Sequence, residues 1–485
     1  MRSADAGGEP DAAADAWLRH RELFGIRPGL GRMRLLLDRL DRPETRFDAI
    51  HVVGSNGKTS TVTMAAAMLA RPGTRVGAYV SPHLVAFRER IHVDGRPLSP
   101  EAFAAAVAQT RAAAEAMEAD PALDLDGPVT QFEAVTAAAF VALADAGVDC
   151  AVIEAGLGGR WDATNVLPAA PPSGSPAVAV LTSVSLEHTR WLGHTVAEIA
   201  TEKVEVLRPG GVLVLAAGLP AEAREVADRV AAERGATVVV APPTPGGPAG
   251  TVSPAAPAAI PVAGASGGAL PVPRPVHGVG RPVPGYQRAN LATAVMAVTA
   301  YRGEAADPDG AAVRAAGRIV VPGRFEVVEG GAGVGPGDAS PGADAAGPDR
   351  PRGPIVIHDG AHNPAGFAAL ADAVAEAAPP RPIVVLLGVL DDKDPSAMVA
   401  RLERVAETVV VAAPRNPRAL DAGRLAAVVT ATLPDVAVHV ASSAHDGLAR
   451  ARTLAGPEGT VLVTGSLHLV AELRRGAQAP PGAAF

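Results

Sequence analysis

The chain has 485 residues, of which 48% are hydrophobic and 3% aromatic, so it is long enough for the cores of two or three domains. Its 43 Lys and Arg against 51 Asp and Glu give a formal net charge of −8, which argues against a general nucleic-acid binder. Cys150 is the single cysteine, which excludes a disulfide framework and a Cys-based zinc site. No apolar run reaches the ~18 residues of a membrane span, and we expect a cytoplasmic protein.

The first elements lead up to a strand. Residues 1–15 are acidic and Ala-rich, and we expect them to form a disordered tail. Apolar residues recur at helical spacing over residues 17–40, with a Gly/Pro interruption, which predicts two helices around a turn. The β-branched run at residues 50–53 then predicts a strand, and residues 61–69 predict a helix.

A Gly-rich turn joins that strand to that helix and reads Gly-Ser-Asn-Gly-Lys-Thr-Ser over residues 54–60. Glycines let the backbone turn so that its N–H groups face an anion. Lys58 would place a positive charge on the outer phosphates, and the hydroxyl of Thr59 or Ser60 can bind Mg²⁺. The turn predicts a phosphate loop of the short G-x-x-G-K-T form. The alternative is an ordinary strand–helix turn with an exposed lysine.

Strands and helices alternate through the rest of the first half. The predicted strands lie at 75–80, 150–153, 178–182 and 212–215, and the predicted helices at 100–117, 132–146 and 199–206. This order indicates a parallel sheet flanked by helices, in which ligands bind beyond the carboxyl ends of the strands. Ser81, Glu154 and His188 each follow a predicted strand closely. We therefore expect these three side chains to converge beside the phosphate loop.

The second half contains two low-complexity segments, at 241–284 and 330–353, which are rich in Pro, Gly and Ala. A helix is predicted between them at 287–300, and residues 320–326 are predicted to join two domains. The later predicted elements are strands at 354–358, 383–387, 408–412, 436–440 and 460–463, and helices at 365–377, 396–405, 422–432 and 446–455. The sequence thus predicts an α/β protein: a parallel-sheet ATPase domain with the phosphate loop over 16–320, and a smaller Rossmann-like α/β domain over 321–485.

Several short motifs, in their order along the chain, resemble the folylpolyglutamate synthase/dihydrofolate synthase family, a branch of the Mur ligase superfamily. They include Gly54-Ser55-Asn56-Gly57-Lys58, Ser81-Pro82-His83-Leu84, Glu89-Arg90-Ile91, Glu154-Ala155-Gly156-Leu157-Gly158-Gly159-Arg160, Leu186-Glu187-His188-Thr189, Glu202-Lys203, Pro322-Gly323-Arg324 and Asp359-Gly360-Ala361-His362-Asn363-Pro364. Together they cover nearly the whole chain apart from the tail and the low-complexity segments. The chain departs from the family pattern at Ser55 and Thr59, and at residues 204–206 after Lys203.

The resemblance implies an ATP- and Mg²⁺-dependent ligase of folate biosynthesis that acts as a monomer. It would add L-glutamate to dihydropteroate, to reduced folates, or to both, through an acyl phosphate. Two anions meet in the first step, so positive charge has to be concentrated there. In the family a second metal site is formed by the counterparts of Ser81, Glu154 and His188, a set that suits a hard divalent ion. A capping or core role is the alternative for His188.

The same resemblance makes Lys203 the lysine that family members carbamylate, which would convert it into an anionic metal ligand. Glu205 could weaken that modification, and the alternative is an ordinary surface lysine. ATP is expected to contact Ser55, Asn56, Gly57, Lys58, Thr59, Ser60, Asn290, Arg324, Asp359 and His362. Arg324 suits a bidentate phosphate contact, with an interdomain salt bridge as the alternative, and His362 could instead cap the helix that follows.

The pterin-bearing substrate is expected to contact Arg27, Pro28, Gly29, Thr130, Gln131, Phe132, Glu133, Trp161, Asp162 and Ala163. Phe132 can stack on a flat ring unless it is a core aromatic, and Asp162 can accept hydrogen bonds from an aminopterin edge. Two other functions stay open at this point. One is a peptidoglycan-type Mur ligase acting on a UDP-sugar peptide, which the Gly-Lys-Thr sequence favours weakly and the Ser81 and Glu154 motifs oppose. The other is a degenerate ATP-binding regulator.

Overall fold

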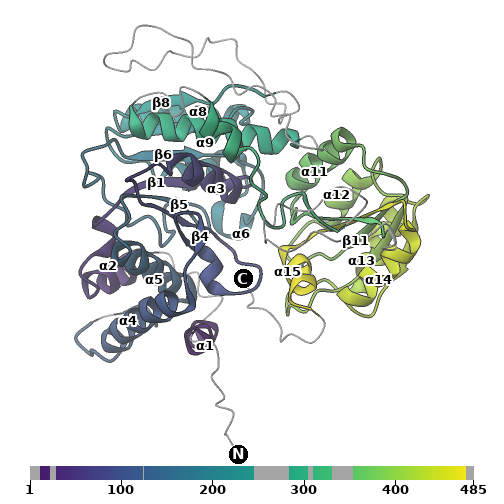
Figure 1. Cartoon of the computed structure of the whole chain (residues 1–485), viewed down its shortest axis with the longest axis horizontal. Coiled ribbons are helices and arrows are strands. Elements are labelled where there is room, and N and C mark those ends of the chain that lie inside the picture. Colours follow the sequence, from purple (N-terminus) through teal and green to yellow (C-terminus); the bar gives the residue numbers. More distant parts are fainter. Residues whose placement is uncertain are drawn as a thin grey trace, which may run out of the picture. The chain divides into compact units, whose positions relative to one another are not determined.

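The computed structural model describes residues 11–21, 29–123, 125–244, 283–303, 310–329 and 353–476. They divide into two units (Figure 1). Unit 1 holds the described residues up to 244 and those from 287 to 319, and unit 2 holds residues 283–286 and those from 320 onward. Arg27 and Pro28, the first ten residues of the predicted tail, and nearly all of the two low-complexity segments lie outside the described ranges.

Unit 1 is built on a sheet of eight strands within the described ranges, in the order β4-β3-β2-β5-β1-β6-β7-β8. The strands are β1 Asp48–Val53, β2 Val76–Tyr79, β3 Ile91–Val93, β4 Arg96–Pro97, β5 Cys150–Glu154, β6 Val178–Leu181, β7 Val212–Leu215 and β8 Thr237–Val240. The neighbours from β2 through to β8 pair in parallel, and β3 pairs antiparallel with both β2 and β4. The predicted parallel sheet therefore has an antiparallel hairpin at one edge.

Helices cover both faces of this sheet. They are α1 Ala12–His20, α2 Gly31–Asp38, α3 Lys58–Leu69, α4 Pro100–Glu118, α5 Gln131–Asp145, α6 Thr189–Leu192, α7 Val196–Val204, α8 Ala221–Glu233, α9 Gly285–Arg302 and α10 Ala311–Ala316. One face packs on α3 and α9, and the other packs on α7 and α8. Because both faces are buried, the central strands are apolar runs rather than alternating ones. Helix α1 begins at Ala12, so the last residues of the predicted tail are helical.

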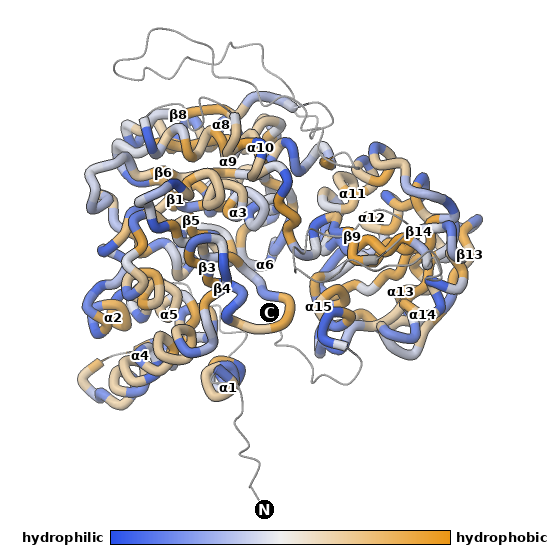
Figure 2. The backbone as a smooth tube through the Cα atoms, viewed as in Figure 1, coloured by the Kyte–Doolittle hydropathy of each residue, from blue (hydrophilic) through white to orange (hydrophobic). Residues whose placement is uncertain are grey.

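Unit 2 has its own sheet, with the order β13-β12-β11-β14-β10-β9 among the described strands. Its elements are β9 Glu326–Glu329, β10 Ile355–His358, α11 Pro364–Ala377, β11 Ile383–Leu387, α12 Pro395–Val399, β12 Thr408–Val411, α13 Ala422–Thr432, β13 Ala437–Val440, α14 Ala444–Ala455, β14 Thr460–Thr464 and α15 Leu467–Arg475. Only β9 runs antiparallel within this described sheet. The hydrophobic residues lie along its strands, as Figure 2 shows for β9 and β14, and they form a separate core.

No helix within the described ranges combines the length and the apolar character that crossing a membrane requires.

Candidate active site

The turn between β1 and α3 has the backbone of a phosphate loop. Gly57 has φ +85°, and a Cβ atom there would lie 2.4 Å from Oδ1 of Asn290. Gly54 has φ +151°, and a Cβ atom there would lie 2.0 Å from Oγ1 of Thr182. Both positions therefore require glycine. Helix α3 starts at Lys58, so the N–H groups of its first turn are available to an anion.

The residues after β6 hold this turn in shape. The N–H of Ser55 donates to the carbonyl of Ser183 at 2.9 Å, and the N–H of Asn56 donates to the Ser183 hydroxyl at 2.8 Å. The hydroxyl of Thr182 donates to the carbonyl of Asn56 at 2.7 Å. Nζ of Lys58 donates to the carbonyl of Gly54 at 2.9 Å, so this side chain folds back over the turn. The loop is thus ordered by the chain's own hydrogen bonds.

Glu154 lies at the carboxyl end of β5 and connects the phosphate loop to the loop after β2. Its side chain is 2% exposed. Oε1 accepts from the hydroxyl of Thr59 at 3.2 Å, and Oε2 accepts from the N–H of Ser81 at 3.1 Å. Of the two candidate hydroxyls, that of Thr59 therefore meets the carboxylate, while Ser60 is buried. The structure brings Ser81, Glu154 and Thr59 together, and Thr59 directly follows Lys58 in the sequence.

These residues fit a magnesium ion by their chemistry. Mg²⁺ prefers oxygen ligands, uses few protein side chains and keeps several waters. A buried carboxylate beside two hydroxyl-bearing residues supplies such oxygens, and a cation would offset the cost of burying its charge. Within the described part of the chain, no group of three or more His, Cys, Asp or Glu side chains could hold a metal. A metal here would thus have a mixed set of ligands.

Lys203, in α7, is a buried residue and not a surface lysine. It is 1% exposed, and its Nζ donates to Oε1 of Glu187 at 2.9 Å. Burial lowers the pKa of Lys203, although Glu187 opposes this effect. Burial alone would raise the pKa of Glu187, but the charges of Lys203 and Lys58 outweigh it and lower that pKa. The phosphate-loop lysine, Glu187 and Lys203 therefore share one electrostatic environment.

His188 stands between Glu187 and α6 and adopts a left-handed conformation with φ +46°. Its charge adds to those that lower the pKa of Glu187. The side chain of His188 does not cap α6. The capping alternative is therefore wrong, and a metal-binding role for His188 stays a prediction.

The side chain of Glu205 lies with arginines. Its carboxylate pairs with Arg160 at 3.4 Å and with Arg234 at 2.6 Å. Arg160 also pairs with Glu202 at 3.0 Å. The negative charge of Glu205 is thus paired with Arg160 and Arg234, and its effect on a modification of Lys203 stays a prediction.

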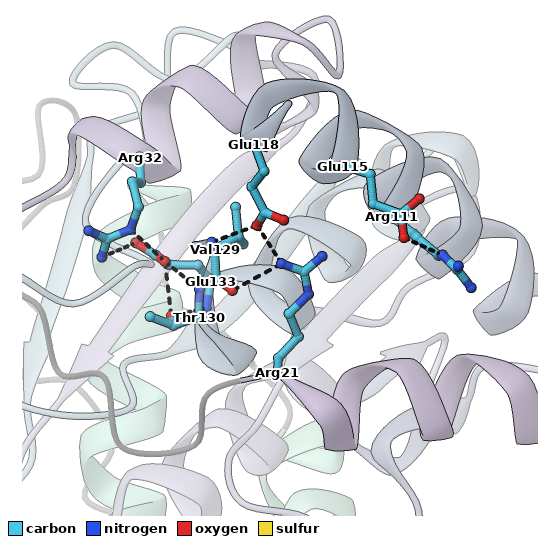
Figure 3. A network of polar contacts seen from close by, with 8 residues as sticks. All are labelled: Arg21, Arg32, Arg111, Glu115, Glu118, Val129, Thr130 and Glu133. Atoms are coloured by element: carbon cyan, nitrogen blue, oxygen red, sulfur yellow. Dashed lines mark hydrogen bonds and ion pairs between the residues drawn. The ribbon is translucent and has the colours of Figure 1, made fainter. Parts of the chain in front are cut away.

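Three of the predicted substrate residues, Thr130, Gln131 and Glu133, take part in contacts that hold helices together. The side chain of Glu133 accepts two bonds from Arg32, at 3.1 and 3.2 Å, and closes a capping box with Thr130 at the start of α5 (Figure 3). Nε2 of Gln131 donates to the carbonyl of Leu18 in α1 at 2.9 Å. These polar side chains are buried, and their contact with a substrate stays a prediction. The sequence did not indicate this role, because Arg32 lies far from α5 in the chain.

The remaining predicted substrate residues lie around the turn after β5. The ring of Phe132 is half-buried against Gly156, where a Cβ atom would lie 2.5 Å from the ring. Trp161 is 52% exposed, whereas Asp162 and Ala163 are buried. Both carboxylate oxygens of Asp162 accept hydrogen bonds from the same loop, a structural role the sequence did not reveal. Contact of these residues with a substrate stays a prediction, as it does for Gly29.

Arg90 is a buried cation near the site that the sequence reasoning left without a role. It is 4% exposed, and its Nε donates to Nδ1 of His83 at 3.0 Å. Burial lowers the pKa of Arg90, while Tyr79 and Glu154 act in the opposite direction. The signal in the sequence that could have indicated Arg90 was a charged residue directly before the short strand β3.

In unit 2, Asp359 organises the loop after β10. It accepts bonds from the N–H groups of Phe325 and Ala361, both at 2.8 Å, and from the hydroxyl of Tyr286 at 3.0 Å. Burial raises the pKa of Asp359, and the charge of Arg324 opposes this. The helix that follows, α11, is capped by Asn363, which accepts from the N–H of Gly366 at 2.7 Å.

Of the two alternative roles predicted for unit 2 residues, the capping role of His362 is contradicted, whereas the interdomain salt bridge of Arg324 stays a prediction. Because Asn363 caps α11, the capping role predicted for His362 is wrong, and Nδ1 of His362 lies 2.8 Å from the carbonyl of Gly360. Arg324 donates to the carbonyl of Gly323 at 3.1 Å. Contacts of Asn290, Arg324, Asp359 and His362 with ATP stay predictions.

Comparisons with known proteins show which family this chain resembles. Residues 349–467 match the family model described as Mur ligase, glutamate ligase domain. The chain is 34% identical over 454 residues to the dihydrofolate synthase/folylpolyglutamate synthase of Mycobacterium tuberculosis, covering 88% of this chain and 83% of that protein. It is 32% identical over 476 residues to the Bacillus subtilis protein of the same name, covering 95% and 98%.

Solved structures of similar proteins extend over nearly the whole chain. The Mycobacterium tuberculosis folylpolyglutamate synthase complexed with ADP matches with a TM-score of 0.73 and 31% identity, covering 98% of this chain and 99% of that one. The Escherichia coli FolC in complex with DHPP and ADP matches with a TM-score of 0.73 and 28% identity, covering 97% and 98%. The chain therefore belongs to the dihydrofolate synthase/folylpolyglutamate synthase family, within the Mur ligase superfamily.

Proposed function

We propose that the protein is an ATP- and Mg²⁺-dependent amide ligase that joins L-glutamate to dihydropteroate, to reduced folates, or to both. The observation that carries the proposal is the Glu154 carboxylate, which accepts from both Thr59 of the phosphate loop and Ser81. It puts metal-binding oxygens beside the lysine that would meet the nucleotide's outer phosphates. The printed names of the relatives support the same reaction class.

The reaction has two steps. A carboxylate oxygen of the folate-type acid attacks the γ-phosphorus of ATP, ADP leaves, and an acyl phosphate forms. The amine of glutamate then attacks the carbonyl carbon, loses a proton, and releases phosphate that carries one of the former carboxylate oxygens. Lys58 and the N–H groups at the start of α3 would stabilise the charge on the phosphates. Mg²⁺ would be held by Thr59 and by Ser81 with Glu154, and it would supply further positive charge.

We further propose two Mg²⁺ ions, with Thr59 at one and Ser81, Glu154 and His188 at the other, and carbamylation of Lys203. The lowered pKa of Lys203 supports its carbamylation, because the neutral amine is the form that reacts with CO₂. The ion pair with Glu187 opposes it, since it favours the charged amine.

The nucleotide is proposed to contact Ser55, Asn56, Gly57, Lys58 and Asn290 in unit 1, and Arg324, Asp359 and His362 in unit 2. Phe132 and Trp161 are proposed to contact the pterin-bearing substrate, because both offer aromatic surface that is at least partly exposed. A monomeric state and a cytoplasmic location stay predictions.

A coupled assay of ADP release tests the function, with mass spectrometry of the product. Purified protein is given ATP, Mg²⁺, L-glutamate and either dihydropteroate or tetrahydrofolate. We expect ADP and a glutamylated product in equal amounts, and loss of both with Lys58→Ala or Glu154→Gln. Turnover only with a UDP-sugar peptide would support the peptidoglycan-type alternative, which the folate-enzyme relatives do not favour. Nucleotide binding without turnover of any acid would support the regulator.

A further inference from the structure

A chain of buried hydrogen bonds runs from the middle of the unit 1 sheet to the turn after β5. It starts at His51 in the central strand β1, whose side chain is 4% exposed. Nε2 of His51 lies 2.8 Å from Oγ1 of Thr164, which is fully buried. The hydroxyl of Thr164 in turn donates to Oδ1 of Asp162. The sequence reasoning gave no role to His51 or to Thr164.

The direction of these bonds follows from the protons available. A threonine hydroxyl has one proton, and Thr164 gives it to Asp162. The imidazole therefore has to be the donor in the bond between His51 and Thr164, with its proton on Nε2. Burial lowers the pKa of His51 to about 3, and the nearby Arg208 adds to this effect. The ring is thus neutral near pH 7, and Nε2 carries its single proton.

Asp162 holds together the loop after β5, in which this chain of hydrogen bonds ends. Its Oδ1 also accepts from the N–H of Thr164 at 3.0 Å, and its Oδ2 accepts from the N–H of Leu157 at 2.8 Å. Asp162 therefore ties the start of the loop, just after Glu154, to its end. Gly156 of this loop lies directly against the ring of Phe132, and the exposed Trp161 immediately precedes Asp162.

We propose that Thr164, held in place by His51, is a positioning residue for the acceptor substrate, because it fixes Asp162 and hence the shape of the loop over residues 156–164. The proposal rests on the proposed function, because the acceptor it concerns is the folate-type acid. The His51 side chain lies on the opposite face of the sheet from its neighbours Ile50 and Val52. A buried neutral imidazole carries a desolvation cost that its bond to Thr164 offsets.

The test compares two substitutions at Thr164 with one at a matched site. Thr164→Val keeps the shape but removes the hydroxyl, whereas Thr164→Ser keeps the hydroxyl. Thr110→Val is the control, because Thr110 is also fully buried in unit 1 and donates to a carbonyl, that of Ala106, at 2.9 Å. KM for the acceptor, KM for ATP, kcat and thermal stability are measured for each protein.

We expect Thr164→Val to raise the acceptor KM about ten-fold, the effect of one lost hydrogen bond in a fixed loop, with little change in the ATP KM. Thr164→Ser should restore the acceptor KM to within about three-fold, and Thr110→Val should lower only the melting temperature. An unchanged acceptor KM in a folded Thr164→Val, or an equal rise in Thr110→Val, overturns the proposal. Absence of turnover in the unmodified protein would instead overturn the proposed function.

Discussion

Single residues decide whether the phosphate loop can form. Gly57 and Asn290 are in such close approach that a methyl group does not fit between them, and Asn290 comes from α9, far along the chain. The loop's shape is therefore set by a distant helix as well as by its own glycines. The steric effect of a side chain at Gly57 can therefore be tested separately from the effect of its positive φ.

We expect Gly57→Ala to abolish measurable ATP binding, with Gly73→Ala as the matched control. Gly57 has φ +85° and Gly73 has φ +83°, so both substitutions impose the same backbone strain of about 1 kcal/mol. Only at Gly57 does the new Cβ overlap another residue, whereas nothing lies within 4 Å at Gly73. Calorimetric titration with ATP distinguishes them. Equal affinities for the two variants would contradict this account of the loop.

The sequence indicated much of the site at this scale, but not its details. The glycines, Lys58, Ser81 and Glu154 could be placed because they follow strands of a parallel sheet. The choice between Thr59 and Ser60 could not be made, since one step along a helix turns the side chain by about 100°. The contacts of Asp162 and Glu205 with their own neighbours were equally invisible, because they depend on side-chain directions.

At the scale of elements, buried ion pairs connect helices that are distant in the chain. Glu133 at the start of α5 bonds both Arg32 of α2 and its own capping residue Thr130 (Figure 3). On the outer side of α4, Glu115 pairs with Arg111 at 2.7 Å, and both side chains are about half exposed. Glu133 and Glu115 both pair with an arginine, but only the first pair is buried. The two pairs should therefore contribute differently to the stability of the protein.

We expect Glu133→Gln to destabilise the protein by about 3 kcal/mol, because it leaves Arg32 buried without its charge partner. Glu115→Gln should change the stability by less than about 0.5 kcal/mol, as is usual for an exposed pair. Denaturant unfolding measures both. The folded Glu133→Gln protein should retain the acceptor KM. A raised KM with unchanged stability would show that Glu133 binds the substrate, as the sequence predicted, and would contradict the structural role.

Strand β10 also carries a buried histidine, and its surroundings differ from those of His51. His358 is 5% exposed, and neither ring nitrogen has a hydrogen-bond partner within the described part of the chain. Burial lowers its pKa from 6.5 to about 4, with Arg474 adding to the effect. Between these values the unfolded chain binds a proton that the folded one does not, so the stability of unit 2 should fall as the pH falls from 6.5 to 4.

We expect His358→Leu to raise the stability of the protein and to do so more at pH 5 than at pH 8. The wild-type histidine contributes a loss of about 1.4 kcal/mol per pH unit over that acidic range, and leucine contributes none. Melting temperatures across pH 4–8 provide the measurement. A stability difference that does not change with pH would contradict this account. It would mean that His358 binds a proton equally well in the folded and unfolded states.

The helices and strands that the sequence predicted include the apolar central strands of both sheets. The elements it missed are β3, β4, α8, β8, α10, β9 and α15. Several of these are short or lie at sheet edges, where fewer apolar residues are needed and polar ones are tolerated. Strand β9, for example, begins and ends with glutamate, and it is defined by its antiparallel pairing with β10.

For the whole molecule, the described residues form two α/β units with separate cores, and the second unit takes in residues 283–286 as well as those from 320 onward. The sequence could predict the two units because two rounds of strand–helix alternation are separated by low-complexity segments. Of the contacts expected for the nucleotide, those from the loop and Asn290 belong to unit 1 and those from residues 324, 359 and 362 to unit 2. Local sequence patterns predict each set of contacts by itself, but they do not predict the arrangement of both sets around one ATP.

The central claim is that a substrate carboxylate attacks the γ-phosphate of ATP beside Lys58 and Glu154. The most direct measurement uses a folate-type acid whose carboxyl oxygens carry a heavy oxygen isotope, with the isotope content of the released phosphate read by mass spectrometry. The acyl-phosphate route predicts that each phosphate released with product contains one heavy oxygen from the acid. Product formation with unlabelled phosphate would contradict it, because the carboxylate would then never have been bonded to phosphorus.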